Sequence, residues 1–446
     1  MGPPAIHSFA VAWNLLCSRL LFKEDYVRLK MLSIGLTTAL AIIYASVFVP
    51  SASAATERVL HSFNTTGSNG EVPYSSLTFD TAGNLYGTTQ IGGDGNEGTV
   101  FELMPRTGGG WTEKVLHRFQ NNGTDGVVPY SNVIFDPAGN LYGTTTAGGA
   151  FGYGTVYELI PQAGGTWEER ILHSFDPNTG TDGYTPYAGL ILDAAGNLYG
   201  TTTSGGTNFH YGTVFELKRN AGGGWTEKIL HDFNENGADG FVPYAGLVFD
   251  TAGNLYGTTL QGGTAQGSNS SIGTVFQLKH GAGGVWTETV LHSFLVNGID
   301  GNYLDGGIIF DASGKLYGTT FFGGSNDNGT VFELSPGAGG VWTETLLHNF
   351  ADNGTDGWGS NAGLVFSAGN LYGTTTHGGS NGVGTVFELT PSGGTWTESL
   401  PCIFSSTGTD GEVPYAGLIL DTAGNLYGTT GGGGAFGGGT VFEMNP

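Results

Sequence analysis

Residues 140–145 read Asn-Leu-Tyr-Gly-Thr-Thr, and the last five residues of this phrase occur seven times in the chain. The copies are marked by their tyrosines: Tyr86, Tyr142, Tyr199, Tyr256, Tyr317, Tyr372 and Tyr427. They follow one another at intervals of 56, 57, 57, 61, 55 and 55 residues. A sequence that repeats at a fixed period folds as a stacked or circular array of one unit. The repeat therefore decides the architecture before any single residue does.

The unit around this phrase contains four short β-prone runs. In one copy they are residues 133–135, 141–145, 155–159 and 167–175. Turn sequences rich in glycine, proline, aspartate and asparagine separate these runs. No part of the unit has the apolar spacing of a helix. Four short strands with short connections predict one antiparallel meander.

Seven such meanders predict an all-β chain, folded as a seven-bladed β-propeller with four antiparallel strands per blade. An open β-solenoid is the alternative, but its coils are usually shorter than ~30 residues. Two smaller propellers would need a linker, and no linker interrupts the period.

The two ends of the repeat region complement each other. Residues 56–63 match residues 112–119, which form the fourth run of a unit, whereas residues 439–444 match a third run. We therefore expect the N-terminal strand to pair with the C-terminal one and to close the last blade. That pairing covers both open sheet edges, which would otherwise invite aggregation.

The segment before the repeats has the features of an export signal. Residues 32–49 contain no charge, Arg28 and Lys30 precede them, and Ala52-Ser53-Ala54 follows. A basic, then apolar, then small-residue order is typical of a secretory signal peptide. The predicted domains are an upstream extension (residues 1–30) ahead of a start at Met31, a signal peptide (residues 31–55) and a single propeller (residues 56–446). A membrane-anchoring helix is the alternative, because 18 residues just span a bilayer. Export predicts a secreted, extracellular or periplasmic protein without a stable membrane span after cleavage.

The composition excludes some classes of function. The 446 residues include 14 Lys+Arg against 38 Asp+Glu, giving a net charge of −24. A nucleic-acid-binding protein needs a basic surface, so no nucleic-acid partner is expected. The two cysteines, Cys17 and Cys402, have no metal-type spacing and form no disulfide framework. Such an acidic chain is expected to be soluble and monomeric.

The repeated phrases G-L-V-F-D-x-A-G-N-L-Y-G-T-T, G-T-V-F-E-L and W-T-E-x-V-L-H-S-F together resemble a known family. It is the bacterial extracellular tandem-repeat family called GloVer, which occurs in "choice-of-anchor" architectures. The resemblance covers residues 56–446 and implies a propeller-like fold and an exported or surface location. It implies no particular activity. The phrase F-D-x-A-G-N-L-Y also resembles the inner strands of NHL-type and streptogramin-lyase-type propellers, which places the first strand of each unit innermost.

Strand direction assigns the connections to two faces. Connections between the second and third strands, and between one unit and the next, share what we call the loop face; the tight turns share the opposite turn face. The loop face carries the variable aromatic residues and histidines, and these are the predicted binding residues: Phe151, Tyr153, Phe209, His210, Tyr211, Tyr303, Phe321, Phe322, Trp358, His377 and Phe436. Exposed aromatic residues stack on sugars or anchor partner side chains. Packing beneath their own glycine-rich loops is the alternative.

Three polar positions also repeat, and we interpret all of them structurally. The aspartates before glycine in the connections between units are turn formers, although oxygen-rich loops leave calcium as an alternative. The histidines at His61, His117, His173, His231, His292 and His348 lie on separate blades and cannot converge on one ion. The glutamates of the third strands are expected to form hydrogen bonds between blades. We therefore predict no metal and no cofactor.

The sequence thus favours an exported binding module for glycans or surface proteins rather than an enzyme. No nucleophile elbow, phosphate loop or zinc-helix motif is present. One alternative is a lyase or hydrolase at the central funnel, in which His210 or His377 would meet carboxylates from other blades. Another is a structural matrix protein. Blades four to six depart most from the consensus, at Leu304-Asp305, Phe321-Phe322 and Ser360-Asn361, so a single functional patch is expected there.

Overall fold

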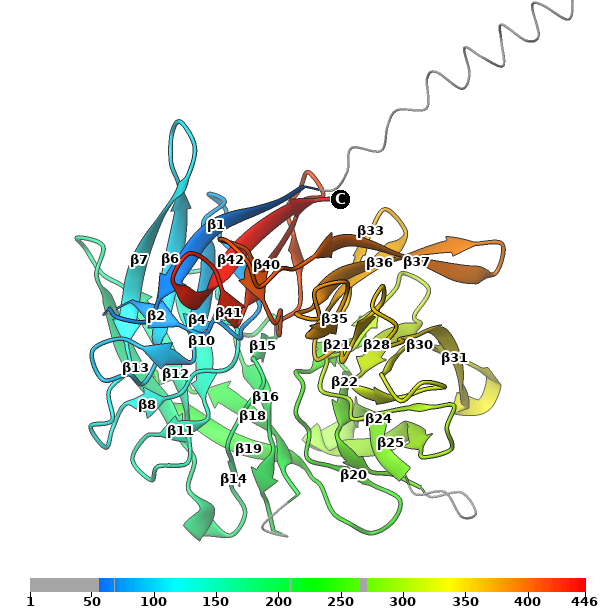
Figure 1. Ribbon diagram of the computed structural model, residues 1–446. Helices are drawn as coiled ribbons and strands as arrows, with labels where there is room; N and C mark the ends of the chain where they lie inside the picture. Colours follow the sequence, from blue (N-terminus) through cyan, green and yellow to red (C-terminus); the bar gives the residue numbers. More distant parts are fainter. Residues whose placement is uncertain (1–55, 68, 208–210, 265–270) are drawn as a thin grey trace, which may run out of the picture. The chain divides into compact units, whose positions relative to one another are not determined.

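A computed structural model describes residues 56–446 except for residues 68, 208–210 and 265–270. These residues form a ring of seven small antiparallel sheets, a seven-bladed β-propeller (Figure 1). The predicted fold class is thereby confirmed. The predicted upstream extension and signal peptide lie outside the described residues, so they stay predictions.

Each blade is one meander of four strands, in the order that the sequence predicts. In blade 2 the order across the sheet is β13, β12, β10 and β9, from the fourth strand to the first. The strands of the blades are as follows: blade 1, β3 (Thr78–Phe79), β4 (Leu85–Thr89), β6 (Thr99–Pro105) and β7 (Trp111–Arg118); blade 2, β9 (Ile134–Phe135), β10 (Leu141–Thr145), β12 (Thr155–Pro161) and β13 (Trp167–Ser174); blade 3, β15 (Ile191–Leu192), β16 (Leu198–Thr202), β18 (Thr213–Arg219) and β19 (Trp225–Asp232); blade 4, β21 (Val248–Phe249), β22 (Leu255–Thr259), β24 (Ser271–His280) and β25 (Trp286–Leu295); blade 5, β27 (Ile309–Phe310), β28 (Leu316–Thr320), β30 (Thr330–Pro336) and β31 (Trp342–Asn349); blade 6, β33 (Val365–Ser367), β34 (Asn370–Thr375), β36 (Thr385–Ser392) and β37 (Thr395–Ile403); blade 7, β39 (Ile419–Leu420), β40 (Leu426–Thr430), β42 (Gly437–Asn445) and β1 (Thr56–Asn64).

The ring closes between the two ends of the described chain. Strand β1 pairs antiparallel with β42, from Thr56 opposite Asn445 to Asn64 opposite Gly437. The blue and red ribbons lie side by side in Figure 1. Phe63 at the end of β1 is fully buried and packs with Phe101 of blade 1, with ring centroids 5.1 Å apart. The predicted closing strand is therefore confirmed.

A second, shorter ladder stands on the loop face of every blade. It joins the connection before the first strand to the connection after the second strand, a pairing that the sequence analysis did not predict. The pairs are β2 (Gly70–Glu71) with β5 (Ile91–Gly92), β8 (Gly126–Val127) with β11 (Ala147–Gly148), β14 (Gly183–Tyr184) with β17 (Ser204–Gly205), β20 (Gly240–Phe241) with β23 (Gln261–Gly262), β26 (Gly301–Asn302) with β29 (Phe322–Gly323), β32 (Gly357–Trp358) with β35 (His377–Gly378), and β38 (Gly411–Glu412) with β41 (Gly432–Gly433). Glycine is required in these ladders, because a Cβ on Gly126 would collide with the Thr145 side chain.

The core lies between neighbouring blades. Tyr86 and Phe119 of blade 1 pack against Leu141 and Leu159 of blade 2, and equivalent clusters fill the other junctions. The glycine of each Tyr-Gly-Thr phrase leaves room for an aromatic ring from the third strand; in blade 2 a Cβ on Gly143 would collide with Tyr157. Close packing of this kind fixes each blade against the next.

Helical structure is limited to three short 3-10 turns in the described part of the chain: η1 (Pro177–Thr179), η2 (Ala282–Gly284) and η3 (Ala338–Gly340). Within the same residues, none of the helical segments has the length and apolar character needed to cross a membrane.

Candidate functional site

Five of the predicted binding residues meet on the loop face of blades 5 and 6. We call Tyr303, Phe322, Phe321, His377 and Trp358 the aromatic platform. Consecutive rings in this order lie with centroids 5.7, 4.5, 6.4 and 4.2 Å apart. The first three contacts are edge-to-face and the last is a parallel stack. The rings therefore form one connected series across two blades.

The short ladders hold these rings in place. Phe322 lies opposite Asn302 in the β26–β29 pair, and Trp358 lies opposite His377 in the β32–β35 pair. Tyr303 follows β26 with a positive φ of 58°. Valine or threonine adopts a similar φ at the equivalent position of five other blades, so this backbone conformation belongs to the repeat and not to a specialised site.

The platform is partly open to solvent and carries no positive charge near neutral pH. Tyr303 and Phe322 are each 38% exposed, and the other three side chains are half-buried. Burial lowers the pKa of His377, so its imidazole is neutral at pH 7. The Nδ1 atom of His377 lies 2.8 Å from the hydroxyl of Thr376, which orients the ring. In the described part of the chain, His377 therefore contacts a hydroxyl and aromatic rings, and not a carboxylate.

The structure does not bring the remaining predicted binding residues into this platform. Phe151 and Tyr153 on blade 2 are 47% and 43% exposed, and Tyr153 packs edge-on against Tyr184. Tyr211 packs on Phe241, and its hydroxyl bonds to Glu235. Phe436 on blade 7 is 62% exposed. Phe209 and His210 lie outside the described residues.

A ring of tyrosines, which the sequence analysis did not single out, surrounds the axis of the propeller. A cavity of about 140 Å³ is lined there by residues that precede the first strand of all seven blades. Five blades contribute a tyrosine, with neighbouring rings 4.6–5.9 Å apart: Tyr74, Tyr130, Tyr187, Tyr244 and Tyr415. Blades 5 and 6 contribute Asp305 and Asn361 instead. The sequence contains the signal for this ring, since Pro-Tyr stands at this position in the five other blades, and Leu304-Asp305 and Ser360-Asn361 depart from it.

Burial in this axial cavity changes the acidity of its groups. It raises the pKa of Asp305 to about 7. Burial, together with the charge of Asp305, raises the pKa of Tyr415 to about 12. Asp305 is therefore close to half protonated at neutral pH, and its carboxyl group can donate or accept a hydrogen bond.

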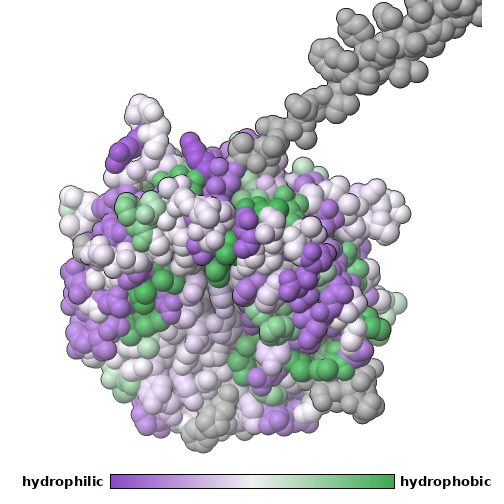
Figure 2. Space-filling view, in the orientation of Figure 1, coloured by the Kyte–Doolittle hydropathy of each residue, from purple (hydrophilic) through white to green (hydrophobic). Residues whose placement is uncertain are grey.

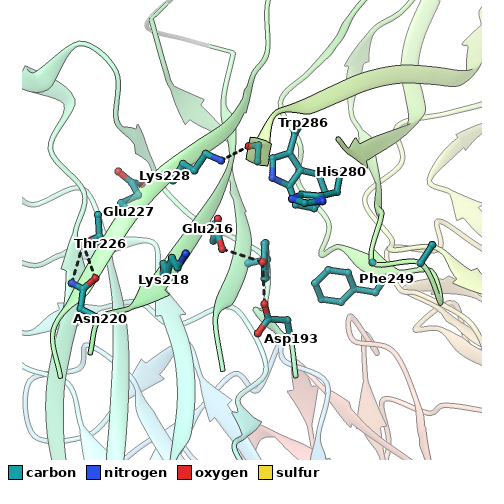
Figure 3. Close-up of a pocket in the computed structure, with 14 residues that line it drawn as sticks. Asp193, Glu216, Lys218, Asn220, Thr226, Glu227, Lys228, Phe249, His280 and Trp286 are labelled. Carbon is teal, nitrogen blue, oxygen red and sulfur yellow. Dashed lines mark hydrogen bonds between the residues drawn. The ribbon is translucent and has the colours of Figure 1, made fainter. Parts of the chain in front are cut away.

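A groove lies on the turn face between blades 3 and 4. Its volume is about 870 Å³. Figure 3 shows Trp286 and His280 on one side, with Lys228 reaching across to a backbone oxygen of blade 4. A groove of about 600 Å³ with the equivalent tyrosine and tryptophan lies between blades 5 and 6. Because the groove recurs, it follows from blade packing rather than from one specialised site.

The glutamates of the third strands form hydrogen bonds within a blade, so the expectation of bonds between blades was wrong. The Tyr142 hydroxyl lies 2.7 Å from Glu158 Oε1 and 3.1 Å from Asp136 Oδ2, all in blade 2. Asp136 Oδ1 also accepts the backbone N–H groups of Ala138 and Asn140. Sequence period alone could not show this pairing, because the register of β10 against β12 places Tyr142 opposite Glu158.

The repeated histidines do lie on separate blades, as predicted, but each meets acidic residues that the sequence analysis did not connect with it. One is the aspartate of the following connection, whose place Asn69 takes beside His61, and the other is a glutamate on the fourth strand of the next blade. In four of these groups one donor atom from each residue lies within 4.8 Å of the other two. We call them the junction clusters: His117, Asp125, Glu169; His173, Asp182, Glu227; His292, Asp300, Glu344; and His348, Asp356, Glu398.

The visible surface is otherwise mixed. Figure 2 shows hydrophobic residues in separate patches among hydrophilic ones, without one continuous apolar face in that view. No broad apolar interface is therefore visible among the described residues on this side.

Comparison with solved structures finds other proteins with a similar fold. An ancestral GH74 enzyme is 12% identical with a TM-score of 0.53, and the match covers 88% of this chain and 51% of that one. PorZ, a surface component of the type-IX secretion system of Porphyromonas gingivalis, is 14% identical with a TM-score of 0.50, covering 86% and 48%. The chain thus spans about half the length of these two proteins. At such identities the similarity concerns the fold alone.

A search of curated proteins finds no match. The family model described as the Gloeobacter/Verrucomicrobia repeat matches residues 40–268 and 260–446. These two matches cover nearly all the repeats from which the resemblance was inferred. The chain therefore belongs to the Gloeobacter/Verrucomicrobia repeat family.

Proposed function

We propose that this protein is an exported binding module that recognises glycans through the aromatic platform of blades 5 and 6. The connected series of five partly exposed rings is the observation that carries the proposal. Aromatic side chains offer a large contact area and lose little conformational entropy on binding, which is why they dominate recognition sites. The leader-like sequence before the repeats supports export.

The chemistry of the surface favours an uncharged glycan over an anionic one. The chain has a net charge of −24, so polyanions are repelled at long range. The platform itself has a neutral imidazole and no lysine or arginine among its five members. The C–H groups on the face of a sugar ring can pack against aromatic side chains. The platform presents both the faces and the edges of its aromatic rings for such contacts. A surface protein is the other partner class that the sequence analysis favours.

A glycan array with the purified full chain tests this proposal. We expect binding to uncharged polysaccharides that is lost in the double variant Phe322→Ala/Trp358→Ala. The matched control is Phe151→Ala/Tyr153→Ala on blade 2, which removes two exposed aromatic rings outside the platform. Equal losses in both variants would contradict a role for the platform. Binding to a protein in a pull-down, without any glycan signal, would overturn the choice of glycan.

A further inference from the structure

The junction clusters have the geometry of a metal site. In the His117 cluster, the imidazole Nε2 lies 3.3 Å from Asp125 Oδ2 and 3.6 Å from Glu169 Oε1. The corresponding distances are 3.1 and 3.7 Å in the His173 cluster, and 3.3 and 3.6 Å in the His348 cluster. Ligands on a tetrahedral zinc ion at roughly 2.0–2.1 Å would be about 3.3–3.4 Å from one another. In these three clusters the distances from the imidazole nitrogen to the two carboxylates are therefore already near the spacing that zinc requires, and in the His292 cluster the distance to Glu344 is 3.6 Å.

In three of these clusters, one oxygen of each carboxylate has no hydrogen-bond partner, although the other aspartate oxygen accepts a backbone N–H group. Asp125 is 5% exposed, and its Oδ1 atom has no hydrogen-bond partner; the same holds for Glu169 Oε1 beside it. Asp182 and Glu227 repeat this arrangement, as do Asp356 and Glu398. Two adjacent carboxylates, each with an unpartnered buried oxygen, are costly to bury unless a cation or a shared proton compensates them.

One junction without the aspartate provides an internal contrast. At the junction of blades 7 and 1, Asn69 takes the place of the aspartate. Its amide Nδ2 donates to Glu113 Oε2 at 2.5 Å, so the glutamate has a donor there. The carboxylate pair, and with it the need for a cation, is absent at this junction.

A second junction changes the histidine instead. At the junction of blades 6 and 7, Cys402 replaces it, with Asp410 and Glu57 nearby. Cysteine and histidine are both common ligands of zinc, so this exchange keeps a donor that prefers a transition metal.

We propose that the four junction clusters bind divalent transition-metal ions, with zinc as the best fit, and that each ion ties two adjacent blades together. A neutral imidazole and two carboxylates supply three ligands and a charge of −2, which one Zn²⁺ compensates. Calcium fits less well, because it takes six to eight oxygen ligands and no imidazole nitrogen. The histidine and aspartate come from one blade and its following connection, and the glutamate from the next blade, so metal binding would stabilise the folded ring.

Native mass spectrometry of the full chain tests this inference. The protein is stripped with EDTA, dialysed and titrated with zinc chloride. We expect about four zinc ions per chain, a rise in Tm with zinc, and the visible absorption of a tetrahedral site when Co²⁺ replaces zinc. Glu169→Gln should lose one ion. Glu113→Gln, at the junction with Asn69, should lose none.

The same substitution at other junctions guards against a variant that does not fold. Glu227→Gln and Glu398→Gln should each lose one ion as well. If no zinc is retained and the Tm is insensitive to EDTA, the carboxylate pairs share protons and the inference is wrong. Equal zinc uptake by the parent, Glu169→Gln and Glu113→Gln would also overturn it, because the zinc would then be held adventitiously on the acidic surface. Failure here leaves the aromatic platform untouched, since the two sites share no residue.

Discussion

The indole of Trp358 lies parallel to the imidazole of His377, with the ring centroids 4.2 Å apart and the planes at 15°. The two residues are directly opposite each other in the β32–β35 ladder, so main-chain register builds the stack. Other blades carry different pairs at this position, for example Val127 with Ala147 in blade 2. The stack is therefore a feature of blade 6, added to a ladder that all blades share.

The stack should contribute to ligand binding. We expect Trp358→Ala to weaken binding of the glycan identified on the array by roughly 5- to 10-fold, which is about 1–1.4 kcal/mol and typical of a buried aromatic contact. Isothermal titration calorimetry measures the Kd. The control is Phe436→Ala on blade 7, which removes a 62% exposed ring outside the platform and should leave the Kd unchanged. An unchanged Kd for Trp358→Ala would exclude this residue from the contact surface.

Replacing Tyr157 by phenylalanine should stabilise the folded protein. Its ring is fully buried, and its hydroxyl has no hydrogen-bond partner in the described structure. The equivalent residue of the other six blades is phenylalanine. Removing a buried hydroxyl without a partner should raise the free energy of unfolding by about 1 kcal/mol. Urea unfolding of Tyr157→Phe measures the change.

The matched control for this substitution lies in the same blade. Tyr142→Phe removes a hydroxyl that bonds to both Glu158 and Asp136, so it should lower the free energy of unfolding by about 1–2 kcal/mol. The prediction requires Tyr157→Phe to raise the free energy of unfolding and Tyr142→Phe to lower it. A loss of stability in Tyr157→Phe would mean that its hydroxyl is bonded in solution.

Because β1 closes the ring, we expect this N-terminal strand to contribute as much to the stability of the fold as the equivalent strand of an internal blade. Phe63 of β1 and Phe175, which follows β13, are equivalent residues, and both are fully buried. Each change to alanine should therefore cost about 3–5 kcal/mol of unfolding free energy. Thermal and urea unfolding compare the two variants. A small effect of Phe63→Ala beside a large effect of Phe175→Ala would show that β1 is frayed and that blade 7 is open.

Asp305 should make stability depend on pH. Burial raises its pKa from 3.8 to about 7 in the folded chain. Between these values the folded state binds a proton that the unfolded state has lost, so the stability contributed by Asp305 falls as pH rises from about 4 to about 7, and is level above that. Asp305→Asn should make the free energy of unfolding depend less on pH between about 4 and 7. At pH 8 this variant should be more stable than the parent protein.

Urea unfolding at several pH values, with EDTA present throughout, measures this effect. Asp352→Asn is the control, because Asp352 is exposed in the connection after β31 and does not line the axial cavity. Parallel profiles for the parent and Asp305→Asn between pH 4 and 7 would show that Asp305 is ionised in the folded state.

Most of the fold could be predicted from the repeated sequence. The Leu-Tyr-Gly-Thr-Thr phrase, the turns beside it and the complementary ends predicted seven blades and the pairing of β1 with β42, and the structure has both. These features depend on local patterns and on their number, which a linear sequence contains. The short loop-face ladders were missed because each strand has only two residues, which is too few for a recognisable period.

The candidate sites were predictable only in part. Blades four to six could be chosen because their residues departed from the consensus, and the platform lies on blades 5 and 6. The assignment of each third-strand glutamate to a neighbouring blade was wrong, because cross-strand register and not period decides which residue a carboxylate meets. Glu169 was not connected with His117, although both residues repeat, because they belong to different copies of the unit.

The sequence by itself determined the unit, its number of copies and the strand that closes the ring, since hydrophobic alternation and turn chemistry act over a few residues. Only the tertiary structure decided which side chains of one blade face the next. That choice depends on the twist and packing of whole sheets, which bring together His117, Asp125 and Glu169 from positions up to 52 residues apart.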